Sequence, residues 1–211
     1  MKICSFASAL VVAGWLAGMA GLTPAAASEV PQGEPFIMRL LGKDPSKRKV
    51  SACFVRVYDA DHLAKHPKQK VGAMMLLISG EPDTESKSVT YSFRLGITFR
   101  DRSTRFQSAG NCNNAKPIDA DGKESGPVRF GCSVDCDGGG FGLTLSDDNK
   151  SALLKVDDRI SIWRKNGDSE PQDSLEADAE DREFRLDRTS LADCVPLAED
   201  RKEAADLRRG N

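Results

Sequence analysis

Residues Val89–Arg100 read VTYSFRLGITFR, and this stretch decides the fold class. Its apolar side chains recur at every second position: Tyr91, Phe93, Leu95, Ile97 and Phe99. A period of two places side chains on one face of a β-strand, so the segment predicts a strand that is apolar on one side and polar on the other. Gly96 lies on the polar side, and we expect a bend or bulge there.

A second alternating stretch, Val128–Cys136, predicts another half-buried strand. Shorter stretches of the same character are Cys53–Tyr58, Val71–Ser79, Arg105–Ala109, Phe141–Ser146, Ala152–Val156, Arg159–Arg164 and Glu183–Asp187. Glycine- and aspartate-rich turns at Asp137–Gly140, Asp147–Lys150 and Asp157–Asp158 separate several of them. One-sided alternation with tight connections predicts a mainly β protein, a single antiparallel domain of about eight or nine strands. We favour a small barrel over a two-sheet sandwich.

Helix is expected only as one or two short turns. Ala60–Lys65 follows Asp59, which is a good N-cap residue, and Leu191–Cys194 has the length of a single turn. Phe36–Leu41 fits either a short helix or a strand.

The chain begins with a stretch typical of a secretory signal peptide, residues 1–27. A positive Lys2 precedes an apolar run, Pro24 ends that run, and three alanines stand before Ser28. The alternative is a retained membrane anchor, but the run is short and diluted by glycine and alanine. We therefore expect cleavage, and no stable membrane anchor after it.

The mature chain is expected to contain a flexible lead-in over residues 28–49 and one antiparallel domain over residues 50–197. Within that domain, residues 168–182 are rich in acids and predict a solvated loop. Residues 198–211 contain helix formers but little apolar surface, so we expect a charged tail that frays.

Cysteine usage fits an oxidising compartment. The chain has six cysteines, and Cys4 leaves with the leader. The other five predict two disulfides and one leftover thiol, which we expect to be buried. Cys112 and Cys132 flank one loop and form the favoured pair, whereas Cys194 pairs with either Cys136 or Cys53.

The charge balance argues against nucleic acid as a partner. Thirty basic residues stand against 32 acidic ones, so the chain has no large excess of positive charge. Several arginines gather near one predicted hairpin, among them Arg94, Arg100, Arg102 and Arg105, and we expect them to be solvated or paired with acids.

One cluster has the residue types of a metal site, namely Asp59, Asp61, His62 and His66. A spacing of four places both imidazoles on one helix face, an arrangement that can hold a transition metal. Pro67 disfavours helical geometry at His66, and no third ligand is evident. A capped helical turn with polar histidines is the simpler interpretation, so we expect no cofactor.

These observations favour an exported, non-catalytic β protein, in the periplasm or outside the cell. Its inward aromatic residues form either a packed core or the wall of a cavity for a small apolar ligand: Tyr91, Phe93, Phe99, Phe130 and Phe141. Such a protein could instead act in the cell envelope. The alternatives are a metal-dependent enzyme that uses His62 and His66, and a secreted module that binds or inhibits another protein.

Overall fold

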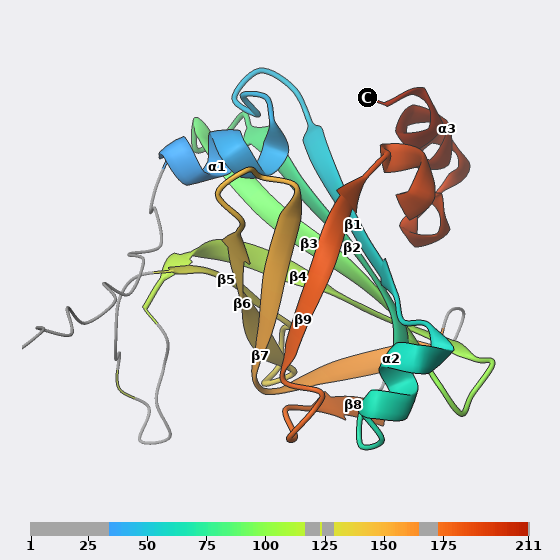
Figure 1. Ribbon diagram of the computed structural model, residues 1–211. Helices are drawn as coiled ribbons and strands as arrows, with labels where there is room; N and C mark the ends of the chain where they lie inside the picture. The colour runs from blue at the N-terminus through green and yellow to red at the C-terminus, as the bar shows by residue number, and fades with distance from the viewer. Residues whose placement is uncertain (1–33, 117–122, 124–128, 165–172, 211) are drawn as a thin grey trace, which may run out of the picture.

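The strands form a closed antiparallel barrel of eight strands with one additional strand, as the sequence predicts (Figure 1). The computed structural model describes residues 34–116, 123, 129–164 and 173–210. The strands are β1 Val50–Val57, β2 Val71–Asp83, β3 Ser88–Phe99, β4 Arg105–Ala115, β5 Arg129–Ser133, β6 Gly139–Leu145, β7 Ser151–Arg164, β8 Asp173–Glu176 and β9 Glu183–Thr189. The expected leader lies outside the described residues.

The barrel closes because β9 returns to the first strand. Strands β1 to β6 follow one another around the wall, β6 pairs with β7, β7 with β9, and β9 with β1. The last contact is short, since it covers only Cys53–Val55 on the β1 side. Beyond Val55 the two strands are no longer paired, and this leaves an opening in the outer wall.

Strand β7 corrects one predicted turn. Asp157–Asp158 lies inside this long strand and not between two strands. The β6–β7 register shifts between the Gly139 and Phe141 pairs, so the two aspartates fall at an irregularity where β7 leaves β9 and begins to pair with β8. Strand β8 in turn lies within the segment predicted as an acidic loop, so part of that segment is sheet.

The bulge expected at Gly96 is also absent, because the pairing of β3 with β2 is regular there. The recorded irregularity lies between Val71 and Ala73 of β2. Gly96 instead lies beneath Leu197, whose Cδ2 atom would be 2.9 Å from a Cβ added at this position. The glycine therefore makes room for a segment that packs on the outer wall.

Helix α1, Glu34–Leu41, lies across one end of the barrel (Figure 1) and confirms the helical alternative for Phe36–Leu41, so this part of the chain is not the flexible lead-in that was expected. Its spacing puts four apolar side chains on the core side, and all are buried: Phe36, Ile37, Leu40 and Leu41. Arg188 of β9 donates to the carbonyl oxygens of Arg39 and Leu40, each at 3.0 Å, and so caps the helix end.

The C-terminal segment is helical, whereas the sequence predicts a tail that frays. A 3₁₀ helix, η1 Leu191–Leu197, leads into α3, Arg201–Arg209, and both stand outside the barrel wall beside β1 (Figure 1). We refer to η1 and α3 together as the C-terminal cap. No helix in the described part of the chain is long and apolar enough to cross a membrane.

Candidate functional site

The inner face of the barrel is a packed core. The five aromatic residues named from the sequence all belong to this core or pack against it. Phe93 meets Phe141 edge to face at 4.9 Å between ring centroids, and Phe130 contacts both Tyr91 and Phe36 of α1. Side chains therefore occupy the positions that would line a cavity.

The histidine segment forms the short helix predicted for it, α2, Ala60–Lys65. The Asp59 carboxylate accepts from the backbone N–H of His62 at 2.7 Å, which is an N-cap, and Asp61 is exposed in the first turn. The Nε2 atom of His62 is hydrogen-bonded to the side-chain oxygen of Gln69 at 3.0 Å. One nitrogen of His62 is thus already engaged with the protein.

The two histidines stack instead of converging on a common point. Ring centroids are 4.6 Å apart between Tyr58 and His62, and 4.4 Å apart between His62 and His66. No group of three or more histidine, cysteine or acidic side chains in the described part of the chain is arranged to hold a metal ion. The cluster serves to hold α2, which has no buried residue of its own, against the barrel.

Both disulfides join distant parts of the chain. Cys112 is bonded to Cys132 directly opposite it across β4 and β5, the pairing that the sequence favours. Cys194 is bonded to Cys53, one of its two predicted partners, and this bond ties the C-terminal cap to β1. The remaining thiol, Cys136, is exposed and not buried as expected, because it lies in the turn before β6 with a positive φ of 57°.

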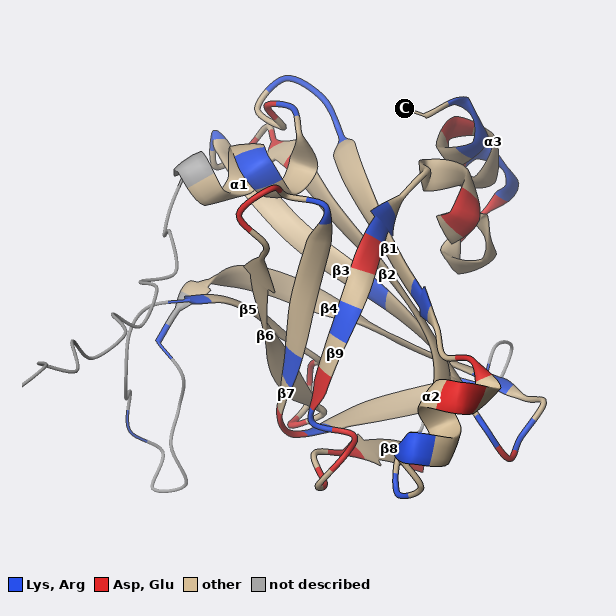
Figure 2. Ribbon diagram, in the orientation of Figure 1, with Lys and Arg blue, Asp and Glu red and all other residues tan. Residues whose placement is uncertain are grey.

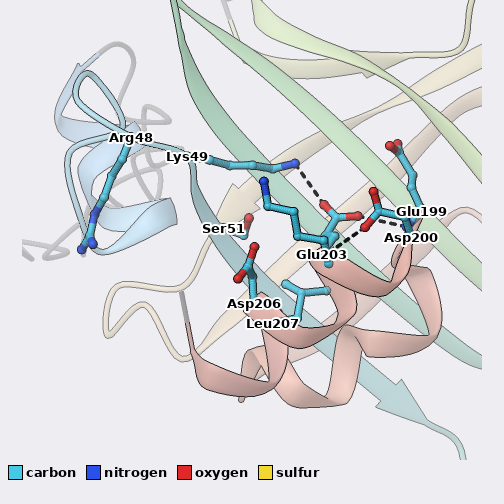
Figure 3. Close-up of a pocket in the computed structure, with 9 residues that line it drawn as sticks. Arg48, Lys49, Ser51, Glu199, Asp200, Glu203, Asp206 and Leu207 are labelled. Atoms are coloured by element: carbon cyan, nitrogen blue, oxygen red, sulfur yellow. Dashed lines mark hydrogen bonds and ion pairs between the residues drawn. The ribbon is translucent and has the colours of Figure 1, made fainter.

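The acidic residue Glu203 in α3 was not anticipated from the sequence. Its carboxylate binds the Lys49 ammonium at 3.0 Å (Figure 3), and it also accepts two hydrogen bonds of 2.5 Å from the Arg94 guanidinium. The bond from Arg94 is the main reason that the pKa of Glu203 falls to about 2. A capping pattern in the sequence could have predicted the helix that carries Glu203. Asp200 accepts from the N–H of Glu203 at the start of this helix, and Gly210 ends it at positive φ.

A second unanticipated acid, Asp181, lies fully buried between β8 and β9. Its two oxygens accept from the backbone N–H groups of Lys70 and Val71, at 2.7 and 3.2 Å. Burial raises the pKa of this carboxyl in spite of those two bonds. Because both oxygens are bonded to backbone, the residue serves to hold the start of β2.

The outer surface of the described residues has several grooves, and two of them that are lined by several charged side chains are candidate binding sites. The first, of about 490 Å³, lies between α3 and the chain that leads into β1 (Figure 3). Arg48 and Lys49 line it on one side, and Glu199, Asp200 and Asp206 on the other. Charges of both signs therefore face one another across it, and Figure 2 shows the same mixture on α3.

The second groove, of about 500 Å³, lies where β1 and β9 separate. It is lined by the stacked rings of α2 and by three arginines: Arg56, Arg182 and Arg185. Neither groove is a catalytic constellation of the kind in which a nucleophile is hydrogen-bonded to a base.

The chain matches no protein-family model, and comparison with curated proteins and with solved structures found no significant match. The site is thus defined by its own geometry alone.

Proposed function

We propose that the protein is an exported, non-catalytic binding module that acts in the periplasm or outside the cell through the outer surface of its barrel. The observation that carries the proposal is the division between a packed interior and two open charged grooves. The apolar leader and the two disulfides support export, since disulfides persist in oxidising compartments.

The hydrogen bonds made by three polar side chains support a binding role over catalysis. Glu203 is bonded to Arg94, Asp181 to two backbone N–H groups, and His62 to Gln69. Each of these groups is occupied in holding one element against another.

The alternatives receive less support. A small apolar ligand inside the barrel would have to replace packed aromatic side chains such as Phe93 and Phe141. A secreted module that binds another protein remains compatible with the proposal, because the groove beside α3 offers charges of both signs to a polypeptide.

Export is tested by expressing the full chain with its own leader in a Gram-negative host and measuring the intact mass in each compartment. We expect a periplasmic or secreted product that begins at Ser28 and has four oxidised cysteines and one thiol. The matched control is a chain that starts at Ser28, which should stay in the cytoplasm. An uncleaved cytoplasmic product with reduced thiols would refute the proposal.

A further inference from the structure

The groove between α2 and the 182–185 segment has a structural origin in the incomplete pairing of β1 with β9. The two strands pair only over Cys53–Val55, so the β1 residues that follow are not covered by the neighbouring strand. Arg56 and Tyr58 stand at this opening, and Arg185 of β9 faces them from the other side. A gap in the wall thus brings side chains from three parts of the chain around one hollow.

Arg56 has unused hydrogen-bonding capacity. Its Nη1 atom donates to Asp187 at 3.0 Å, whereas its Nε atom is buried and has no acceptor among the described residues. No described group accepts from Nη2 either. The Nε and Nη2 hydrogens form the fork with which arginine grips a carboxylate or phosphate with two parallel bonds. A buried donor without a partner costs free energy, so an anion that accepts from this fork would be favoured.

Two further arginines extend the positive charge of the groove. Arg185 lies 3.5 Å from the same Asp187 carboxylate and its side chain is 69% exposed. Arg182 donates to the carbonyl oxygen of Ala177 at 3.2 Å, a contact that leaves its charge unneutralised. A single carboxylate, Asp187, is therefore shared by two guanidinium groups.

One of the two acids on the groove wall is paired with a cation. Glu183 pairs with Lys155 at 2.9 Å, whereas Glu180 accepts from the backbone N–H of Lys68 at 2.7 Å and keeps its negative charge. The rings of Tyr58, His62 and His66 complete the wall as a continuous stack. Because each ring covers the face of the next, the side of this stack offers ring edges to the organic part of a ligand.

We propose that this groove binds a small organic anion, whose carboxylate or phosphate is held by the fork of Arg56 and supported by Arg182 and Arg185. The organic part lies along the stacked rings of Tyr58, His62 and His66. The Arg56 side chain is 36% exposed, but its Nε atom is covered. The guanidinium therefore turns outward on binding, so that Nε can reach the anion. The inference rests on the proposed function, since it assumes that the protein binds ligands through its outer surface and names the class of ligand for one groove.

The test is calorimetric titration of the oxidised mature protein with phenyl phosphate at about 0.15 M salt, where exposed charges are screened over roughly 8 Å. We expect saturable binding at one site. Inorganic phosphate, which lacks the ring, and phenol, which lacks the charge, should each bind more weakly. Equal affinity for phenol and phenyl phosphate would overturn the proposal, as would the absence of saturable binding.

Three substitutions that each remove one positive charge locate the site. Arg56→Gln should weaken binding about tenfold, because it removes the two charge-assisted hydrogen bonds of the fork. Arg185→Gln should weaken binding about threefold. Arg105→Gln removes an exposed arginine outside the groove and should leave the affinity unchanged. Equal weakening by all three would show nonspecific attraction and overturn the proposal.

Two measurements keep the result interpretable. The amide NMR spectrum of each variant shows whether the variant is folded. If Arg56→Gln is not folded, the affinities of Arg185→Gln and Arg105→Gln for phenyl phosphate are compared to decide whether the groove is the binding site. Failure of anion binding would leave the oxidised, processed product of the export experiment intact. Failure of export would leave the titration of the refolded, oxidised protein unaffected.

Discussion

The two sides of β3 show two different ways of being buried. On the inner side, Phe93, Leu95 and Ile97 pack into the barrel core, as the alternating pattern predicts. On the outer side, Arg94 and Gly96 are covered by the C-terminal cap, which the same pattern does not reveal. Alternation tells which face of a strand is apolar, but a polar face can also be covered when its charges are paired.

The partners of the outer face are remote in sequence. Arg94 and Glu203 are 109 residues apart, and Cys53 and Cys194 are separated by 141. Each contact depends on one or two side chains and not on a periodic pattern. The comparison therefore predicts that the inner face is stabilised by many apolar contacts and the outer face by a few specific bonds.

The disulfide of the C-terminal cap should have the largest effect. In the chain-entropy description, replacing Cys53 and Cys194 by alanine removes a constraint worth about 5 kcal/mol, against about 3 kcal/mol for Cys112 and Cys132. The difference arises from the sequence separations of 141 and 20. Urea unfolding of both double variants measures it. A smaller loss for the Cys53 and Cys194 variant would show that the cap adds little to the barrel.

Phe141→Ala tests the inner face. The side chain is fully buried and contacts Phe93, so its truncation should cost about 3–5 kcal/mol of the free energy of unfolding. Leu153→Ala on the outside of β7 is the control, since that side chain is 39% exposed and should change stability by about 0.5 kcal/mol or less. Comparable losses at both positions would mean that the interior is loosely packed.

Glu203→Gln tests the ionic part of the cap. The folded-state pKa of about 2 lies below the ordinary value of 4.5, so the carboxylate stabilises the fold above pH 4.5. That contribution is lost as the pH falls from 4.5 towards 2. At pH 7 we expect the variant to lose about 1–2 kcal/mol in urea unfolding, and its stability to depend less on pH in this window.

Glu199→Gln is the matched control for that experiment, because Glu199 contacts the same arginine at 3.7 Å but is 76% exposed. It should leave both the stability and its pH dependence nearly unchanged. If Glu199→Gln and Glu203→Gln had the same pH profile, the Arg94–Glu203 pair would not be what holds α3.

Gly96→Ala should have the smallest effect of the four. The added Cβ would lie 2.9 Å from the terminal atom of a flexible leucine, so Leu197 can shift, at a cost of about 1 kcal/mol. Gly131→Ala is the control, because its nearest neighbour would be 3.9 Å away. A more stable Gly96→Ala variant would show that the cap does not press on β3.

The sequence was sufficient for the barrel, for the helical turn with its Asp59 cap, and for the Cys112–Cys132 pair, because each rests on a local pattern. It was insufficient for α1, which was short enough to fit helix or strand, and for α3, where Leu207 alone is buried. Asp157–Asp158 has the composition of a turn, yet the residues before it pair with β9 and those after it pair with β8, and this keeps it within one strand. The groove lined by Arg56, Arg182 and Arg185 required the structure, because these arginines are brought together only by the opening between β1 and β9.

Side chains fill the barrel interior, and we propose that ligands meet the outer wall instead. A titration of the methyl-labelled, oxidised protein with laurate, a slender apolar ligand, tests this by NMR. A filled interior predicts no saturable shift of the inward methyl groups of Leu95, Ile97 and Leu143, which are fully buried. Saturable shifts of those three methyl groups would show that the barrel is hollow.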